Sequence, residues 1–323
     1  MKKEVKDKIK YETLDWLKAI IYAVIFGTII RLFVFETMMV PTPSMVPAIQ
    51  EQDRMFVEKI TYSFEEPDTG DVVVFWTPFK DNLNVGQLRF FDNFMDFFSA
   101  DEFDGHVKYV KRLVGKPGDI ITLEPVKDSF WNDIEQNGYE HLPYWVKNLV
   151  EYYEKVKYIP NRIKDQVMQV KINGVTPDDF KNIYYTKDAI FDDDDFWKYM
   201  AYPTKYSREI YNSDLSMVYK GNFQNETIIQ NVDLSLNFFE SYNNAFAYEE
   251  TYDELYSNMN LDEYVYTENG QVYLKVPEGF YFFMGDNSME SLDSRFFGFV
   301  PKENIIGSLF LRIFPFDRFG KIN

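Results

Sequence analysis

VKYVKRLVGKPGD, residues 107–119, is the stretch of the sequence that decides the fold. Its first part is rich in β-branched and aromatic side chains, and the turn signal Pro-Gly-Asp follows at 117–119; this pattern predicts a buried strand. Because side chains alternate across a strand, Lys111 shares a face with Tyr109 and Leu113. We therefore expect the Lys111 amine to point into an apolar interior.

Similar strand-like runs lie on both sides of this stretch. They are bounded by turn signals and occupy residues 54–59, 70–76 and 271–277. We expect these runs to form a mostly β domain built from residues 37–122 and 267–323. An aromatic, partly amphipathic stretch at 86–100 interrupts the pattern, and two interpretations of it stay open: it lies in a membrane interface, or it packs as core or loop.

Residues 123–266 differ in composition and predict an inserted accessory domain of mixed α/β structure. Long segments rich in Tyr, Asn and Asp surround residues 167–174, which have the pattern of a strand and a tight turn. Residues 141–157 are compatible with a helix. The four aspartates 192–195 are typical of a solvated turn, because consecutive carboxylates cannot converge on one cation without a folded loop. No motif in this region indicates chemistry.

The N-terminal region predicts one membrane-spanning helix. Residues 19–30 are apolar apart from one threonine, and the segment 16–36 has the roughly 20 residues that a helix needs to cross the hydrocarbon. Lysines are frequent in the preceding basic tail, 1–15, so the positive-inside rule places the N-terminus in the cytoplasm and the β domain on the outer face of the cytoplasmic membrane. A cleaved signal peptide would need small residues at a cut site, whereas Glu-Thr-Met-Met-Val follows at 36–40. We therefore favour an uncleaved, single-pass anchor.

Charge and composition argue against several classes of function. The net charge of −18, from 34 basic and 52 acidic residues, argues against nucleic-acid binding and against electrostatic docking on anionic lipid. A solvated acidic surface accounts for this charge. The chain has no cysteine and only two histidines, so thiolate sites are excluded and a zinc or iron site is not expected. We predict no metal and no cofactor.

Ser44 is the candidate nucleophile, and it lies in Val-Pro-Thr-Pro-Ser-Met-Val-Pro at 40–47, just after the predicted anchor. A serine hydroxyl is a poor nucleophile until a nearby base takes its proton. Histidine is the usual base, but neither His106 nor His141 has the setting of a Ser-His-Asp triad. A buried lysine is the better candidate, because burial lowers the pKa of an ammonium towards neutrality. The sequence therefore favours a pair of Ser44 and Lys111.

Four sequence boxes, in a fixed order behind an anchor, extend this interpretation. They are Ser-Met-Val-Pro at 44–47, Asp-Arg-Met-Phe-Val at 53–57, Lys-Arg-Leu-Val-Gly-Lys-Pro-Gly-Asp at 111–119, and Gly-Asp-Asn at 285–287 with Ser-Leu-Asp-Ser-Arg at 291–295. Each box alone is common, but together they resemble the bacterial type I signal peptidases, membrane-bound serine proteases that remove signal peptides from exported proteins. The match covers residues 16–122, 167–175 and 271–320. It implies that Ser44 is the nucleophile and Lys111 the general base, within a signal-peptidase-type catalytic β domain.

The same resemblance implies a set of supporting residues. The hydroxyl of Thr42 would donate to the oxyanion, and Ser291 would orient the lysine. Asp293 and Arg295 would brace the site by a salt bridge. Residues 288–290, Ser-Met-Glu, depart from the commonest family pattern.

The resemblance also implies the partners of the chain: signal peptides of preproteins, the lipid bilayer and the secretion machinery. A substrate would bind as an extended strand added to the β domain, with small side chains at the first and third positions before the cut. A self-cleaving Ser-Lys protease of the SOS-repressor type is an alternative, and the anchor counts against it. A second alternative is a membrane-anchored binding or assembly protein with a decayed peptidase domain. The large insertion suits that role, whereas the intact Ser44, Lys111 and Ser291 count against it.

Overall fold

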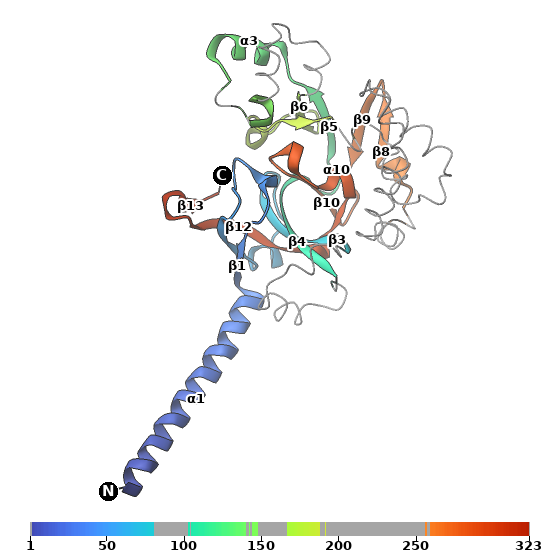
Figure 1. The fold of residues 1–323 in the computed structure, drawn as a ribbon. Coiled ribbons are helices and arrows are strands. Elements are labelled where there is room, and N and C mark those ends of the chain that lie inside the picture. The colour runs from blue at the N-terminus through green and yellow to red at the C-terminus, as the bar shows by residue number, and fades with distance from the viewer. Residues whose placement is uncertain are drawn as a thin grey trace, which may run out of the picture.

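Two antiparallel sheets and a long N-terminal helix make up the described part of the computed structural model (Figure 1). The structure describes residues 2–80, 103, 105–139, 142, 144–147, 167–187, 191, 256 and 259–322. The predicted mostly β fold with an N-terminal apolar helix is therefore confirmed. Three sequence predictions fall wholly or mostly outside the described residues: the stretch 86–100, the aspartates 192–195 and the helix 141–157, of which only 144–147 are seen to be helical.

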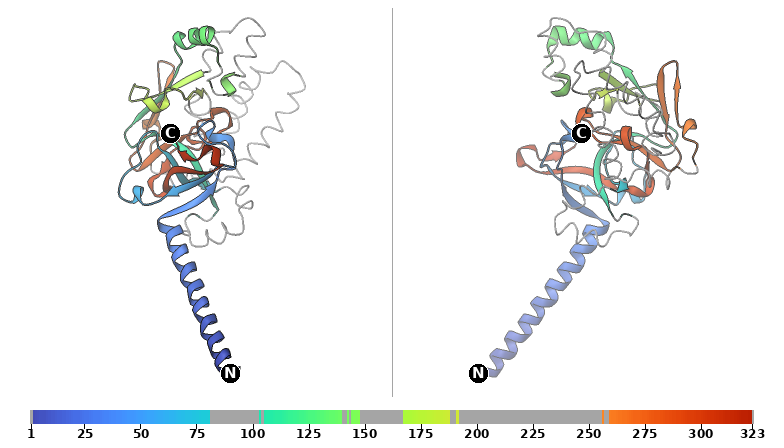
Figure 2. Two further views of the ribbon diagram at one scale, coloured as in Figure 1. Left: turned by 90° about the vertical axis from the view of Figure 1, so that its left-hand side faces the viewer. Right: turned by 45° about the vertical axis from the view of Figure 1, so that its right-hand side comes forward.

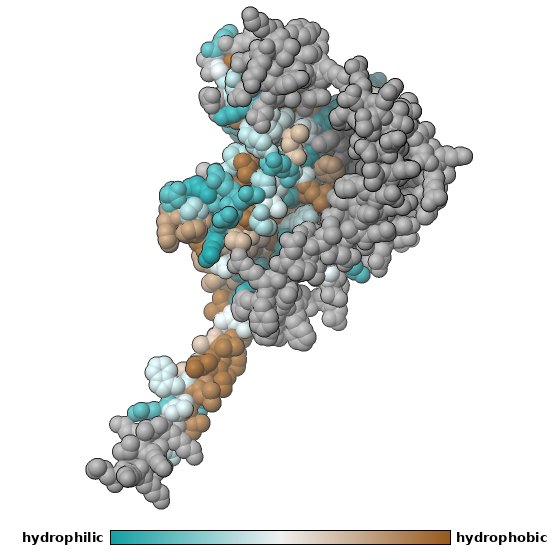
Figure 3. All heavy atoms as spheres, viewed as in Figure 1, coloured by the Kyte–Doolittle hydropathy of each residue, from teal (hydrophilic) through white to brown (hydrophobic). Residues whose placement is uncertain are grey.

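Helix α1, Lys2–Phe33, projects away from the β domain (Figures 1 and 2). Its segment Tyr11–Phe33 is long and apolar enough to cross a membrane and is not buried against the rest of the chain. Apolar side chains gather on the part of this helix nearest the β domain (Figure 3). Such a surface is unfavourable in water and suits a bilayer.

The helix ends three residues before the predicted end of the span at residue 36. Strand β1, Phe35–Met39, begins there and pairs antiparallel with β2, Arg54–Glu58. Glu36 is buried in β1 and forms ion pairs with Lys59 at 2.8 Å and Lys108 at 3.0 Å. A carboxylate with two partners in the β domain packs with that domain, so residues 35 and 36 of the predicted span lie in β1, while the membrane boundary itself stays a prediction.

The larger sheet has eight strands in the order β1-β2-β12-β3-β4-β10-β11, with β13 paired to β12. Its further strands are β3 (Val72–Lys80), β4 (His106–Gly115), β10 (Phe280–Met284), β11 (Val300–Pro301), β12 (Ile305–Phe314) and β13 (Gly320–Lys321). Strand β3 is apolar on both faces because each face meets a separate core: Val73 and Phe75 lie in one cluster, and Val72 and Val74 in another. Strand β3 pairs antiparallel with β4, so the burial of β3 places β4 in the interior of the domain as well.

The smaller sheet has five strands in the order β7-β6-β5-β9-β8. They are β5 (Ile120–Pro125), β6 (Val167–Ile172), β7 (Tyr185–Thr186), β8 (Val265–Glu268) and β9 (Gln271–Lys275). The predicted strand and tight turn at 167–174 are present, with Asn173 and Gly174 both at positive φ, as a tight hairpin turn requires. Apolar side chains of the two sheets share one core, in which Phe75 stacks on Phe283 with ring centroids 4.4 Å apart.

A third apolar cluster lies within the predicted insertion. Helix α3, Asp128–Asn137, contributes Trp131 and Ile134, which are buried with residues that include Trp145 and Tyr184. The division into a catalytic domain and an accessory domain at 123–266 stays a prediction. Strands β6 and β7 come from that range, and β6 pairs with β5. The short helices of the described chain are η1 (Pro43–Met45), η2 (Thr61–Ser63), η5 (Asp178–Phe180), η8 (Leu261–Glu263), η9 (Ser288–Glu290), α10 (Ser294–Phe297), η10 (Lys302–Asn304) and η11 (Phe316–Arg318).

Candidate active site

Ser44 and Lys111 are brought together in the protein interior, beside the larger sheet. Lys111 Nζ lies 2.7 Å from Ser44 Oγ, a hydrogen-bond distance, and the two residues are only 4% and 5% exposed. Lys111 lies in β4, opposite Val73 of β3, and Ser44 lies in η1, which follows β1. The predicted placement of the Lys111 amine in the domain interior is confirmed.

The backbone around Ser44 is held by the loop that follows β10. Asn287 N–H donates to the carbonyl of Ser44 at 3.0 Å, and the Asn287 side-chain amide donates to the carbonyl of Pro43 at 3.1 Å. Gly285 lies so close that a Cβ there would be 2.5 Å from the Ser44 carbonyl oxygen and 2.2 Å from Ser291 Oγ. Only glycine fits this position, because any side chain would push the two loops apart.

Burial changes the acidity of the Lys111 amine. Removal from water lowers the pKa of Lys111 to about 8, while the charges of Asp293 and Asp286 partly oppose this effect and that of Arg295 reinforces it. The amine also lies 5.2 Å from the centre of the Tyr109 ring. A lysine with this pKa is neutral in roughly a tenth of the molecules at pH 7, far more often than a free lysine, and a proton acceptor must be neutral.

Thr42 lies beside the serine hydroxyl at the exposed side of the site. Its Oγ1 donates to Ser44 Oγ at 3.4 Å, and its side chain is exposed. The Ser44 N–H belongs to the first turn of a helix, where backbone donors have no partner within the helix. A hydroxyl and an N–H group are thus available near the position that a substrate oxygen would take.

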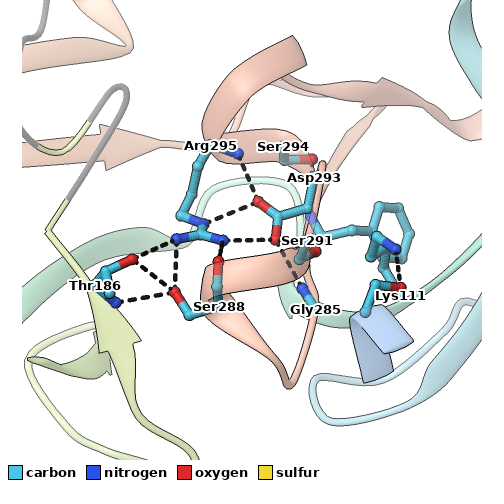
Figure 4. Close-up of polar contacts among 10 residues, drawn as sticks. Lys111, Thr186, Gly285, Ser288, Ser291, Asp293, Ser294 and Arg295 are labelled. Carbon is cyan, nitrogen blue, oxygen red and sulfur yellow. Dashed lines mark hydrogen bonds and ion pairs between the residues drawn. The ribbon is translucent and has the colours of Figure 1, made fainter. Parts of the chain in front are cut away.

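A buried polar network lies behind the pair (Figure 4). Arg295 Nε forms an ion pair with Asp293 Oδ1 at 2.9 Å, and both side chains are fully buried. Asp293 Oδ2 accepts hydrogen bonds from Ser291 Oγ at 2.7 Å and from Gly285 N–H at 2.9 Å. The predicted ion pair is therefore present, whereas Ser291 donates to Asp293 and not to Lys111. Its influence on the lysine would be exerted through the Asp293 charge.

Sequence reasoning missed four other residues of this site. Arg112, next to Lys111, forms a buried two-point ion pair with Asp286 at 2.8 and 2.7 Å, and also donates to the carbonyl of Gly70 at 2.8 Å. Arg112 lies in the box 111–119 and Asp286 in the box 285–287. Their opposite charges were the sequence signal from which this ion pair could have been predicted. Ser288 and Thr186 also contact Arg295. The departure of residues 288–290 from the family pattern was a signal for Ser288, whereas no sequence signal pointed to Thr186.

The histidines and possible metal ligands do not form an alternative site. His106 Nδ1 lies 2.6 Å from the carbonyl oxygen of Thr77, so this ring nitrogen has a backbone partner. His141 is outside the described residues. Within the described part of the chain, no group of three His, Cys, Asp or Glu side chains is arranged to hold a metal ion. The arrangement that remains is a serine hydroxyl beside an amine of lowered pKa, which is suited to acyl transfer.

A family model described as signal peptidase, peptidase S26, matches residues 13–140 and 224–314, more than half of the chain. The chain belongs to this family. The signal peptidase I of Buchnera aphidicola subsp. Acyrthosiphon pisum is 25% identical over 290 residues, which cover 90% of this chain and 71% of the relative. The signal peptidase I of Aquifex aeolicus is 26% identical over 293 residues, which cover 90% of this chain and 79% of the relative. A crystal structure of a signal peptidase I from Enterococcus faecalis V583 matches with 16% identity and a TM-score of 0.24, over 76% of this chain and 97% of the solved chain.

Membership of the signal peptidase family confirms the recognition made from the sequence boxes. As an S26 signal peptidase, the chain is a serine peptidase whose substrates are preproteins. The apolar helix α1 and the family together indicate membrane anchoring. The two sequence alternatives, a soluble self-cleaving protease and a non-enzymatic binding protein, are not supported by these findings.

Proposed function

We propose that this signal peptidase cleaves N-terminal signal peptides from exported preproteins with Ser44 as nucleophile and Lys111 as general base. The contact of 2.7 Å between Lys111 Nζ and Ser44 Oγ in a buried site supports this proposal above all. A hydroxyl and an amine at this distance exchange a proton without a mediating group. The lowered pKa of Lys111, due mainly to burial, supports the same assignment.

The reaction then needs this chain, the substrate and one water molecule. Neutral Lys111 Nζ takes the proton of Ser44 Oγ as that oxygen bonds to the scissile carbonyl carbon. The resulting ammonium gives its proton to the leaving amine nitrogen as the C–N bond breaks, which leaves an acyl ester on Ser44. Lys111 next takes a proton from water, whose oxygen attacks the ester carbonyl, and returns it to Ser44 as the acid product leaves.

Thr42 is proposed as one of two donors to the oxygen that becomes negative during this reaction. Its hydroxyl is within 3.4 Å of Ser44 Oγ, on the exposed side from which a substrate would approach. The backbone N–H of Ser44 is proposed as the second donor. Asp293, Arg295 and Ser291 are proposed to support the base from behind.

The substrate is proposed to bind as a strand at the edge of the larger sheet. Strand β1 is one of the outer strands of that sheet in the described residues, and it leads within five residues to Ser44. Backbone groups at a free edge bind an extended peptide through main-chain hydrogen bonds. The same strand follows directly from α1, so a substrate whose apolar segment ends at the bilayer would meet the site at a similar height.

We further propose the orientation and partners of the enzyme. The basic tail 1–15 is proposed to lie in the cytoplasm, with the catalytic domain on the outer face of the cytoplasmic membrane. The bilayer and the secretion machinery are its proposed partners, and no cofactor is part of the mechanism.

A cleavage assay with purified full-length enzyme and a preprotein tests this function. Ser44→Ala should fold, insert into membranes and lose cleavage, because it removes the nucleophilic oxygen from a site that is otherwise intact. A paired variant, Ser63→Ala, changes an exposed serine of η2 that donates to the carbonyl of Lys59 and has no role in the mechanism, so it should cleave normally. Cleavage by folded Ser44→Ala at the wild-type rate would refute the proposed mechanism.

A further inference from the structure

The hydroxyl of Ser288 lies at the meeting point of two distant parts of the chain. It accepts a hydrogen bond from Arg295 Nη1 at 2.7 Å and another from the backbone N–H of Thr186 at 2.9 Å. The Thr186 hydroxyl lies 3.0 Å from it and also accepts from Arg295 Nη1 at 3.3 Å. Figure 4 shows Arg295 held between this cluster on one side and Asp293 on the other. Thr186 comes from β7, 102 residues before Ser288.

We propose that Ser288 and Thr186 are positioning residues for the peptidase reaction, which hold Arg295 so that Asp293 and the loop around Ser291 stay in place behind Lys111. This inference rests on the function proposed above. It gives a role in the reaction to Thr186, which lies in the predicted insertion, 123–266. Neither residue would touch the substrate. Both act through the buried arginine.

Burial makes the partners of Arg295 important. A fully buried guanidinium needs hydrogen bonds for its five N–H groups, since unpaired ones lose their hydration without replacement. Asp293 accepts from Nε and from Nη2, whereas Ser288 accepts from Nη1 with its hydroxyl and from Nη2, at 2.9 Å, with its carbonyl. Loss of the Ser288 hydroxyl therefore removes the 2.7 Å contact of Nη1 and favours a shift of the whole guanidinium.

A shift of Arg295 would be passed on to the nucleophile through direct contacts. Asp293 holds the Gly285 N–H, and the backbone of Gly285 packs against the carbonyl of Ser44. Ser291 is held by the same Asp293 oxygen. Because a misplacement of roughly 1 Å in a catalytic geometry costs on the order of 100-fold in rate, a small movement here is sufficient.

The electrical effect of the shift has a defined sign. The Asp293 charge raises the pKa of Lys111 and the Arg295 charge lowers it, on top of the larger lowering by burial. If Arg295 moves away, the negative charge of Asp293 is less well compensated, so the pKa of Lys111 rises. The amine then becomes neutral only at higher pH, and the acid side of the pH–activity curve moves upwards.

A second contact from the predicted insertion supports this role for the loop. Tyr144 OH donates to Glu290 Oε1 at 2.5 Å, and the Asn287 side chain donates to Glu290 Oε2 at 3.3 Å. Residues 288–290 are thus held at one end by Thr186 and at the other by Tyr144. Asn287, which holds the backbone of Ser44, lies directly before them.

The test uses the full-length enzyme in detergent, with kcat, KM and the pH dependence of kcat/KM measured on a short peptide substrate. Ser288→Ala and Thr186→Val should both lower kcat with little change in KM, and both should move the acid side of the pH–activity curve to higher pH. For Ser288→Ala the loss in kcat should be on the order of 100-fold. Thr186→Ser keeps the hydroxyl and should retain both values. Thr176→Val is the matched control: it removes a half-buried hydroxyl bond, to the carbonyl of Val170 at 2.9 Å, away from this loop, and should leave the pH limb unchanged.

Two outcomes would overturn the inference. In the first, Ser288→Ala has the wild-type kcat and the wild-type acid side of the pH–activity curve. In the second, Ser288→Ala has a lower melting temperature but an unchanged acid side of that curve, which would mean a structural role alone. If Ser288→Ala does not fold, the same measurements on Thr186→Val test the inference, because Thr186 is only half-buried and its substitution should be tolerated. Lys111→Arg separates this inference from the proposed function. If Lys111→Arg is inactive, a negative result for Ser288→Ala or Thr186→Val overturns only the positioning role. If Lys111→Arg is active, the proposed function itself is overturned.

Discussion

Lys111 Nζ lies within hydrogen-bond distance of Ser44 Oγ, at 2.7 Å, although 67 positions of sequence separate the two residues. The contact depends on two independent features. Strand β4 is buried on both sides and carries the amine inwards, and a short helix after β1 turns the hydroxyl towards it. Hydrogen bonds from Asn287 to the backbone of Pro43 and Ser44 keep that helix in place.

Replacement of the base is the first prediction. Lys111→Arg should be as inactive as Lys111→Met, because arginine keeps its proton in proteins and cannot accept one from Ser44. The pKa of Lys111 is lowered to about 8, mainly by burial, so kcat/KM of the wild type should rise with pH as the amine loses its proton near that value. Peptide cleavage across a pH series measures both effects. Substantial activity in Lys111→Arg would show that a fixed positive charge suffices.

Loss of the proposed oxyanion donor is the second prediction. Thr42→Val should lower kcat by on the order of 100-fold with little change in KM, because the hydroxyl meets a charge that exists only in the transition state. Thr42 is exposed, so the substitution should have little effect on the free energy of unfolding. Thr42→Ser keeps the hydroxyl and is the matched control. If Thr42→Val turned over at the wild-type rate, a different group would have to stabilise the oxyanion.

The third prediction concerns the anchor. Removal of residues 1–33 should give a domain that cleaves short peptides normally and membrane-inserted preproteins poorly, because the anchor raises the effective concentration at the bilayer. The cut belongs after Phe33, since a longer deletion would remove Glu36 and leave Lys59 and Lys108 without their buried partner. Rates on a peptide and on a preprotein in vesicles are compared. An equal loss on both substrates would contradict a tethering role.

Two deletions within the predicted insertion form the fourth prediction. Replacement of residues 192–255 by a flexible linker should preserve peptide cleavage, because all the side chains assigned to the site lie outside this range. Deletion of 176–266 should lower kcat, because it also removes Thr186 and its contacts with Ser288 and Arg295. Both variants are assayed after their fold is checked by circular dichroism. Equal activity of the two would argue against any role of Thr186.

The fifth prediction concerns the stability of the domain. Asp286→Asn should lower the free energy of unfolding by about 3–5 kcal/mol, because it leaves the buried Arg112 charge without its partner. The exposed pair of Lys302 and Glu66 is the control, and Glu66→Gln should have little effect. Urea unfolding of the domain lacking the anchor measures both. A similar, small effect of the two substitutions would mean that Arg112 finds another partner.

Several features of this protein could be predicted from local sequence patterns. A membrane-length apolar segment, the β-branched runs of β2, β3 and β4, and the Asn-Gly turn after β6 each depend on neighbouring residues alone. The alternation of side chains along β4 is also sufficient to assign Lys111 to an inward face. The sequence boxes then identified the family and named the serine and the lysine as a pair.

Sequence by itself thus determined the anchor, the mostly β fold and the identity of the candidate pair, because period, propensity and motif are properties of short segments. The tertiary structure alone decided which partners the polar groups choose: Ser291 with Asp293, Glu36 with two lysines, and Arg295 with Ser288 and Thr186. These contacts join segments that lie far apart in the chain, and no local pattern specifies which of them meet. The low pKa of Lys111 has the same origin, because the burial that lowers it exists only after distant strands have closed around the amine.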